Sequence, residues 1–597
     1  MSENFNNLSK EELIEYINNL RRQLNNEKYG LYFDRKATPE DVVEQCKVEI
    51  PLFLHDTKLD ILNKGGENFL VEGDNFQALT ALNLINKSDG LIDAIYIDPP
   101  YNTGKKDFIY NDKFLDADDG FKHTKWLNFM EKRLILARNI LKEDGVIFIS
   151  IDEHEFAQLK LLCDSIFGEQ NFVENFIWIK NSTKNLSNTT STNHEYVLSY
   201  AKNITEVSSK QLFRIAKPGF REVKQILKDS FETGLSENET QIKIRRFYKN
   251  NPELKGISMY NRVEYSKDKK GFRAFRLSDI SAPKATGRGA IYDVIHPITG
   301  KVCKTPSRGW AYTKETMQSH IDNDLIYFYE SHENVPAYKR YLDTVSTEVM
   351  KSHIVDFNEG KKELVEIFGI APFDNAKPTT LISHLLQITK PDAIILDFFA
   401  GSGTTGHAVL NINEEDGGNR RFILVTNNEG NIMSDVCYPR LKAVITGKRK
   451  DESIYSQGKP ANLRYFRIDY VKDNPSRDQA KFNIVDQLDS LLCFSELTFE
   501  KIYGDFPFNI YSNLTKTKTT SIFNTYFDAF TFKTMLNKAL EIKAEKNVIY
   551  YFSLDNNVDL NIEKQVKKVI ENADVKPIPS KIYEIYKRIA DDLRRDY

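Results

Sequence analysis

Apolar runs and helical patterns alternate along the chain from residue 68 onward. Residues 68–72, 91–97 and 145–151 are apolar runs of strand length, and residues 76–82 and 122–141 between them have the spacing of helices. This alternation is typical of βαβ units. It predicts a largely parallel sheet covered by helices.

The same alternation returns in a second part of the chain, beginning near residue 377. In order, the patterns there indicate a helix over 379–386, a strand over 393–396, a helix that runs through Leu410, and a strand over 421–425. This second part therefore also predicts strands that alternate with helices.

Three further regions lack this alternation. Residues 176–180 and 196–200 are apolar runs that predict strands at the edge of the sheet. Residues 205–375 show no regular pattern, and a last segment from about residue 475 mixes strand runs, such as 548–552, with helices. The last segment carries no recognisable chemistry.

These patterns predict an α/β fold with one Rossmann-like sheet. The predicted parts are an N-terminal helical segment (1–40), a first half of the sheet (41–204), an inserted α+β domain (205–375), the second half of the sheet (376–470) and a C-terminal accessory domain (471–597). In the first part, Ser9 and Glu12 form a capping pattern ahead of an amphipathic helix. That helix packs either on its own domain or on a partner.

Composition narrows the class of protein. The chain has 597 residues, with 41% hydrophobic and 28% charged residues and a net charge of -3, as in globular proteins. Its five cysteines form no Cys-x-x-Cys pair, so we expect neither a disulfide framework nor a zinc site, and no metal is implied. There is no signal peptide pattern and no apolar run of membrane-spanning length, so we expect a cytoplasmic protein without membrane contact.

The strand over residues 91–97 ends at the tetrapeptide Asp98-Pro99-Pro100-Tyr101. Two consecutive prolines remove two backbone donors and fix two φ angles, so the chain leaves the sheet in a rigid conformation. A carboxylate, a carbonyl and an aromatic ring are thereby held at the carboxyl edge of the sheet, where ligands bind in open α/β folds. A plain strand stop is the simpler alternative.

A second polar strand end lies about 300 residues further along, where Asp397 precedes Gly401-Ser402-Gly403-Thr404-Thr405-Gly406. This Gly-x-Gly-x-x-Gly spacing between strand and helix is the fingerprint of a dinucleotide site, with Glu429 placed to take ribose hydroxyls. However, the Asp397 carboxylate opposes a pyrophosphate and suits a positively charged cofactor. S-adenosylmethionine carries a sulfonium, an ammonium and a ribose, and so suits both acidic residues.

A methyl donor gives the first tetrapeptide a chemical role. The exocyclic amine of a base is a poor nucleophile because its lone pair is delocalised into the ring, so a site must accept hydrogen bonds from both of its hydrogens. The Asp98 carboxylate and the Pro99 carbonyl are suitable acceptors, and Tyr101 can stack on the base, which stabilises it by about 1–3 kcal/mol. A base in a duplex must be flipped out to reach them.

With these two motifs in this order, the chain resembles the amino-methylating DNA methyltransferases of the β class, and in particular the modification (Mod) subunits of type III restriction-modification systems. The similarity extends to Asp74, to Trp178-Ile179-Lys180, to Lys377-Pro378 and to Pro306-Ser307-Arg308-Gly309-Trp310. It implies N6-adenine methylation of double-stranded DNA, an S-adenosylmethionine cofactor and a homodimer. It also implies target recognition by residues 205–375, and it leaves open whether a restriction (Res) subunit is a partner.

The resemblance assigns site residues. Asp98, Pro99, Pro100 and Tyr101 would form the target-base pocket, and Asp397, Phe399, Gly401, Ser402, Gly403 and Thr404 would hold the cofactor. Glu429, or its neighbours Asn427 and Asn428, would take the ribose. Asp74 would meet the adenine of the cofactor or, equally, cap a helix, and Lys377 would lie near the methionine carboxylate.

Within residues 205–375, basic and aromatic side chains are interleaved over 243–249 and 267–276. A charge run of this kind is usually a solvated face. The interleaved aromatics favour a second interpretation, a groove that tracks phosphates.

Three other functions stay open at this point. A cytosine-N4 methyltransferase uses nearly the same site, although serine tends to replace the leading aspartate there, so Asp98 favours adenine. A non-catalytic DNA-binding module on the same fold and a dinucleotide oxidoreductase are the others. The recognition sequence cannot be read from the order of residues.

Overall fold

The computed structural model describes residues 31, 33–34, 40–86, 89–110, 113–116, 121–180, 190, 192–283, 289–356, 358–373, 375–472, 489–505, 508–523, 528–552 and 559–578. The predicted N-terminal helix lies outside these residues. The chain forms two compact units, of which one comprises Met1–Leu212 with Lys351–Tyr597 and the other comprises Phe213–Met350.

The first unit is built around an eleven-stranded sheet. Its order is β1 (Glu49–His55), β19 (Ala461–Lys472), β3 (Gly66–Glu72), β18 (Arg421–Thr426), β17 (Ile394–Asp397), β4 (Ile92–Ile97), β7 (Leu141–Ile151), β9 (His194–Ala201), β8 (Phe172–Ile179) and β16 (His353–Val355), with β2 (Ile61–Asn63) paired to β19. All neighbours from β19 to β7 are parallel. The predicted α/β fold is therefore confirmed.

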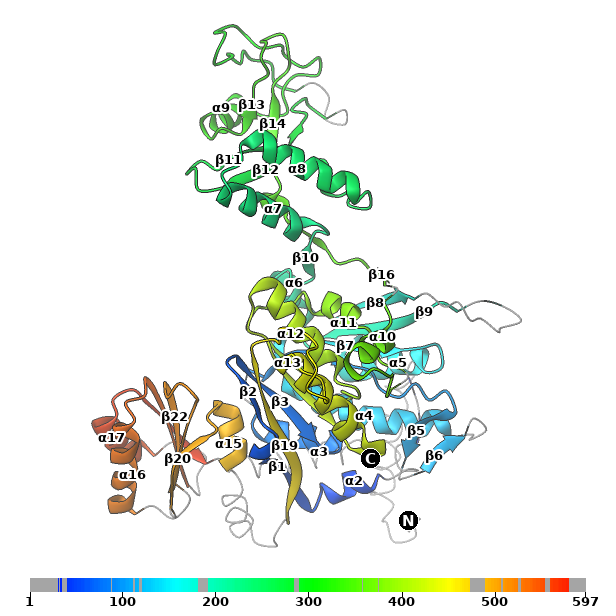
Figure 1. Ribbon diagram of the computed structural model, residues 1–597, viewed down its shortest axis with the longest axis vertical. Coiled ribbons are helices and arrows are strands. Elements are labelled where there is room, and N and C mark those ends of the chain that lie inside the picture. Colours follow the sequence, from blue (N-terminus) through cyan, green and yellow to red (C-terminus); the bar gives the residue numbers. More distant parts are fainter. Residues whose placement is uncertain are drawn as a thin grey trace, which may run out of the picture. The chain divides into compact units, whose positions relative to one another are not determined.

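The two halves of the sheet join between β17 and β4. These strands pair in parallel, with Leu396 opposite Ile95, although about 300 residues separate them in the chain. Figure 1 shows the same interleaving at the other side, where β19 from late in the chain lies between β1 and β3. The pairing of β17 with β4 brings both polar strand ends to one edge of the sheet.

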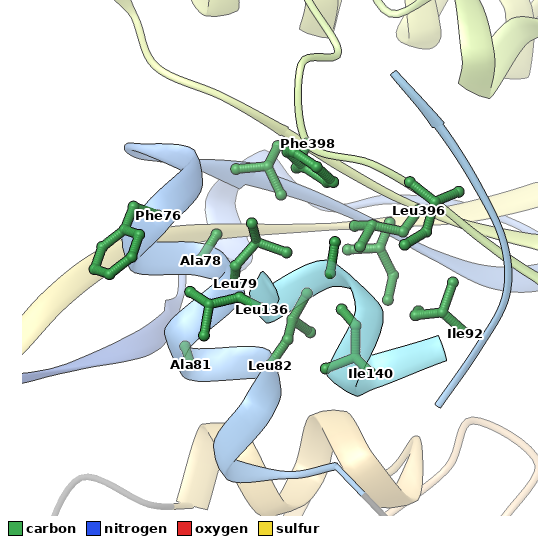
Figure 2. Packing of buried hydrophobic residues seen from close by; sticks show 14 of the residues in the cluster. Phe76, Ala78, Leu79, Ala81, Leu82, Ile92, Leu136, Ile140, Leu396 and Phe398 are labelled. Atoms are coloured by element: carbon green, nitrogen blue, oxygen red, sulfur yellow. The ribbon is translucent and has the colours of Figure 1, made fainter. Parts of the chain in front are cut away.

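Helices α3 (Asn75–Leu84), α4 (Lys122–Ile140) and α5 (Phe156–Phe167) cover one face. Figure 2 shows Leu79 and Leu82 of α3 and Leu136 of α4 gathered with Leu396 of β17 and with Phe398 just beyond it. Burying each such side chain stabilises the fold by about 1.5–3 kcal/mol. This apolar layer holds the ends of β4 and β17 in place.

Helices α11 (Thr379–Leu386), α12 (Thr404–Asp416) and α13 (Tyr438–Thr446) form a second layer. A Cβ at Gly406 of α12 would lie 2.9 Å from the side chain of Leu424 of β18. The neighbours of Leu424 in the strand, Ile423 and Val425, point to the other face, where they pack with α3. Glycine is therefore required there by the close approach of helix and strand. This places the second layer on the opposite face of the sheet.

The expectation that residues 176–180 and 196–200 lie at the edge of the sheet is wrong. β9 lies between β7 and β8, and β16 extends the sheet beyond β8 by a parallel pairing of His353 with Ile177. β16 has only three residues, too few to show a period in the sequence.

The second unit, Phe213–Met350, has an α+β fold and lies inside the 205–375 range. Its elements are β10 (Arg214–Ala216), α7 (Phe220–Glu232), α8 (Glu237–Asn250), β11 (Arg262–Tyr265), β12 (Phe272–Ser278), α9 (Lys314–Asp322), β13 (Ile326–Tyr327), β14 (Ala337–Tyr341) and β15 (Thr347–Val349). The main sheet of this unit has the order β11-β12-β14-β13.

Most of the aromatic residues interleaved with the basic run are buried. Tyr248, Phe272 and Phe275 are buried in the core of the second unit, whereas the lysines and arginines around them are largely exposed. The aromatic spacing therefore reflects core packing. The exposed cations Lys243, Arg245, Arg246, Lys249, Lys267, Lys269 and Lys270 form a solvated face.

The C-terminal region forms a second, smaller sheet within the first unit. Its order is β20 (Glu500–Asp505), β21 (Phe508–Ser512), β22 (Lys518–Phe523), β23 (Lys546–Phe552) and β24 (Ala573–Ile578), with α16 (Ala529–Glu541) and α17 (Leu560–Val569). Phe494 of α15 (Asp489–Glu496) joins it to the main sheet, 4.1 Å from the ring of Phe69. Among the described residues, no helix has the length and apolar character to cross a membrane.

Candidate active site

The chain that follows β4 is held rigidly. Trp126 of α4 donates its indole N–H to the Pro100 carbonyl at 2.7 Å. Asn102, with φ 58°, is buried and donates to Glu155 at 2.5 Å. The prolines and these two anchors fix the direction in which Asp98 and Tyr101 leave the sheet.

Asp98 accepts hydrogen bonds from two side chains. The Lys377 ammonium lies 2.9 and 2.8 Å from the two carboxylate oxygens, and the Tyr101 hydroxyl donates to one of them at 2.9 Å. Lys377 also lies 4.9 Å from the centre of the Tyr101 ring. Lys377 precedes α11, so a residue from the second half of the chain pairs with the tetrapeptide of the first half.

A second carboxylate, Glu195 of β9, completes this group. It lies 3.2 Å from the Tyr101 hydroxyl and 3.5 Å from the Lys377 ammonium. Its other oxygen accepts a hydrogen bond from Lys180, which follows β8. Two carboxylates and two ammoniums thus meet at the carboxyl edge of the sheet, with no net charge.

Burial and these charges shift the pKa values. Burial raises the pKa of Asp98, and Lys377 offsets only part of the effect. Burial also acts to raise the pKa of Glu195, but Lys377 and Lys180 outweigh it and hold that pKa below its ordinary value. Burial would lower the pKa of Lys377, yet the two carboxylates raise it. Glu195 is therefore the more firmly ionised carboxylate of the two.

Asp397 ends β17 and organises the glycine loop behind it. Its carboxylate accepts from the Phe399 amide at 2.9 Å and from the Thr405 hydroxyl. With only 2% of its surface exposed, burial raises its pKa to about 7. The loop therefore closes around a carboxylate that binds a proton readily.

Two glycines give the loop its shape. Gly401 has φ 49°, and a Cβ there would have only the Phe399 carbonyl oxygen nearby, at 3.8 Å, so the space beside it is open. Gly403 has φ 77°, and a Cβ there would lie 3.0 Å from the Cys437 sulfur. Both positive φ angles favour glycine. Gly401 thus leaves the backbone accessible to a ligand, whereas Gly403 packs against α13.

Ser402 and Thr404 turn their hydroxyls inward. They lie 3.2 Å from each other, and the fully buried Arg440 of α13 donates to Thr404 at 2.7 Å. Arg440 also pairs with Glu363 at 2.8 Å. Because both hydroxyls are engaged inside the protein, the predicted contact of Ser402 and Thr404 with the cofactor would be made by their backbone groups. That contact stays a prediction.

The remaining predicted residues occupy varied environments. Asp74 forms a capping box with Gln77 at the start of α3, the alternative interpretation for this residue. Phe399 packs on Phe129 with ring centres 5.9 Å apart. The Glu429 carboxylate is exposed just after β18, where no described residue binds it.

Sequence reasoning missed three charged residues of this region. Glu195 lies in the apolar strand run His194–Ala201, and a charge in such a run was the available signal. Arg440 and Glu363 carried no signal, since each lies on an ordinary amphipathic helix and their pairing joins segments far apart in sequence.

The chain is similar in sequence to known DNA methylases. A family model described as DNA methylase matches residues 92–432, more than half of the chain. The chain is 33% identical over 454 residues to the type III restriction-modification enzyme EcoP15I Mod subunit of Escherichia coli, which covers 70% of this chain and 67% of that protein. It is 30% identical over 448 residues to the type II methyltransferase M.KpnI of Klebsiella pneumoniae. That match covers 69% of this chain and 90% of that protein.

Among solved structures, the PvuII DNA methyltransferase (cytosine-N4-specific) is similar, with 12% sequence identity and a TM-score of 0.29. The match covers 61% of this chain and 85% of that chain. That likeness is too weak to support an argument. The resemblance predicted from the two motifs is confirmed by the family model and by the curated relatives.

Proposed function

The chain belongs to the DNA methylase family and is a DNA methyltransferase of the restriction-modification kind, and we propose that it transfers a methyl group from S-adenosylmethionine to N6 of a flipped-out adenine. One observation carries this proposal. Asp98 and Tyr101 follow β4, the glycine loop follows β17, and these two strands are neighbours. A base-binding end and a cofactor-binding end thus share one edge of the sheet, as open α/β folds require.

The residues fit the cofactor. Gly401 leaves the loop backbone open to close approach, and Asp397 lies within the loop as a buried acidic group that suits a cationic ligand. Glu429 is free to accept ribose hydroxyls at the end of the next strand, β18. When bound, the cofactor supplies an electrophilic methyl group and a neutral thioether leaving group.

The chain's own residues orient the amine. Asp98 and the Pro99 carbonyl would each accept one amine hydrogen, so that the nitrogen lone pair points at the methyl carbon. Tyr101 would stack on the flipped base. After transfer the amine carries one proton more than its neutral form, and Asp98 is the nearest carboxylate through which that proton leaves to solvent.

Adenine is favoured over cytosine by the leading aspartate of the tetrapeptide. We also propose that the second unit, Phe213–Met350, reads the target sequence, with its exposed lysines and arginines on phosphates. Because the relatives include a Mod subunit of a restriction-modification enzyme, we further propose a Res subunit as partner. The homodimer and the cytoplasmic location expected from the sequence stay proposals.

Nucleoside mass spectrometry of plasmid DNA tests this function. DNA incubated with the full chain and S-adenosylmethionine should gain N6-methyladenine, and with Asp98→Asn it should gain far less in the same time, because the neutral amide is a weaker acceptor than the carboxylate. N4-methylcytosine in place of N6-methyladenine would establish the second candidate. No methylated base with any DNA would contradict the proposal.

A further inference from the structure

Asp98 already has most of its hydrogen-bonding capacity in use. A carboxylate offers about four acceptor sites. Lys377 approaches both oxygens, at 2.9 and 2.8 Å, and Tyr101 approaches one of them at 2.9 Å. A target amine that arrives at Asp98 therefore competes with an ammonium and a hydroxyl for the same oxygens.

Glu195 lies within reach of both competitors. The Tyr101 hydroxyl has a single proton, yet it lies 2.9 Å from Asp98 and 3.2 Å from Glu195, so it donates to one carboxylate at a time. The Lys377 ammonium has three protons and lies 3.5 Å from Glu195. A small shift of the Tyr101 hydroxyl or the Lys377 ammonium therefore moves its hydrogen bond from Asp98 to Glu195.

Glu195 is also held where it can receive them. It lies on β9, between β7 and β8, and Lys180 binds its other oxygen. Its side chain is 13% exposed, compared with 25% for Asp98. The carboxylate that is more deeply buried is thus the fixed one, and the more accessible carboxylate is left for the substrate.

We propose that Glu195 is a positioning residue, the alternative acceptor to which Tyr101 and Lys377 move their hydrogen bonds when the target amine reaches Asp98. The inference rests on the proposed methyl transfer. Glu195 touches neither the base nor the cofactor in this scheme. It keeps the tyrosine and the lysine ordered while Asp98 exchanges partners.

Single-turnover methyl transfer to plasmid DNA, by the full chain with saturating S-adenosylmethionine, tests the proposal. Glu195→Gln should slow transfer about 10- to 50-fold, since charged hydrogen bonds to two donors are weakened, while the cofactor Kd in calorimetry stays within about threefold. Glu195→Asp should recover most of the rate. Glu541→Gln, an exposed glutamate on α16, is the matched control and should behave as the wild type.

The pH profile separates this role from a merely structural one. The groups that face Asp98 are Lys377, Glu195 and Tyr101, with Tyr96 and Asp397 close enough to interact with its charge. Glu195 is one of the charges that raise the pKa of Asp98. Glu195→Gln should therefore move the acid limb of transfer to lower pH, although the plateau rate falls.

A double-mutant cycle with Tyr101→Phe adds a second test, and the single variant Tyr101→Phe tests the inference even if Glu195→Gln unfolds. Tyr101→Phe alone should slow transfer about 3- to 10-fold, and much less in a Glu195→Gln background, because the hydroxyl acts through Glu195. In a Glu195→Asp background, which keeps the carboxylate, most of the effect of Tyr101→Phe should remain. Wild-type transfer by Glu195→Gln, a loss confined to cofactor Kd, or additive effects would each overturn the inference. If the wild-type chain itself transfers no methyl group, the proposed function fails instead.

Discussion

The ends of β4 and β17 carry two aspartates that differ in where their hydrogen bonds come from. Asp397 is bound by its own turn, through the Phe399 amide and the Thr405 hydroxyl. Asp98 is bound by side chains, one of them Lys377 from a distant segment. A carboxylate held by groups of its own loop shapes that loop, whereas one held by a side chain from a distant segment can exchange that partner for a substrate.

The two aspartates also differ in exposure. Asp397 is 2% exposed, and the side chain of Asp98 is 25% exposed. Substitution at the first should therefore act on loop shape and cofactor affinity, and substitution at the second on the transfer step. Substitutions at the two aspartates and at their partners should therefore distinguish the two roles.

The largest effect on stability is expected at Arg440, which supports the loop of Asp397. Arg440→Met removes the fully buried guanidinium and leaves the half-buried Glu363 carboxylate with only its hydrogen bonds from Thr379, which should lower the free energy of unfolding by about 3 kcal/mol. Urea unfolding of the full chain measures this. The double variant Arg440→Met with Glu363→Met should lose less than the sum of the two single losses. Equal stability of Arg440→Met and the wild type would mean that the pair contributes nothing to the loop.

The next effect concerns Lys377, which binds Asp98. Lys377 lowers the pKa of Asp98, so Lys377→Met should raise that pKa and move the acid limb of transfer to higher pH. At neutral pH the rate should fall about 10- to 100-fold, with partial recovery in alkaline buffer. Lys538→Met on α16 is the matched control. An acid limb that stays in place would show that Asp98 is not the group that titrates.

A smaller effect is expected at Asp397. Its pKa of about 7 is raised by burial above the ordinary value of 3.8. The native state therefore keeps the proton to higher pH than the unfolded state, so this group's contribution to stability falls as pH rises between these two values. Asp397→Asn should remove that slope.

Cofactor binding should also depend on the protonation of Asp397. A cation bound near Asp397 favours the carboxylate, so binding near pH 6.5 should release up to about one proton and tighten as pH rises. Calorimetry in buffers of different ionisation enthalpy measures the release. Asp397→Asn should release less and bind about tenfold more weakly. Equal proton release by the two chains would contradict a role for this carboxylate.

The smallest effect is expected at Asp74, which has two interpretations. Because Asp74 caps α3, Asp74→Ala should lower the free energy of unfolding by about 1 kcal/mol. If the cofactor also contacts it, the cofactor Kd should rise in Asp74→Ala and not in Gln77→Ala, which disrupts the same capping box. Denaturation and calorimetry on both variants distinguish the two interpretations.

The sequence was sufficient for features that depend on local pattern. The helix over 379–386 was predicted with its observed bounds, and both polar strand ends were placed correctly because prolines and glycines mark them. The pairing of β4 with β17 was not predicted, since no local signal joins segments about 300 residues apart.

Features that depend on distant partners were missed. The pairing of Lys377 with Asp98 was not predicted, and its expected place near the methionine carboxylate stays a prediction. Glu195 and Arg440 were overlooked because their partners lie on other strands and helices. The two interpretations of the basic run in the second unit could not be distinguished from the sequence, since core packing and base stacking use the same aromatic residue types.

Asp98→Asn and Asp397→Asn, compared in one experiment, test the central claim most directly. Cofactor Kd and single-turnover transfer at saturating S-adenosylmethionine are measured for both. The account predicts that Asp98→Asn binds cofactor within about threefold of the wild type yet transfers about a thousandfold more slowly, whereas Asp397→Asn binds about tenfold more weakly and transfers within about tenfold of the wild type. Loss of cofactor binding in Asp98→Asn with normal transfer at saturation would contradict the assignment of the two strand ends.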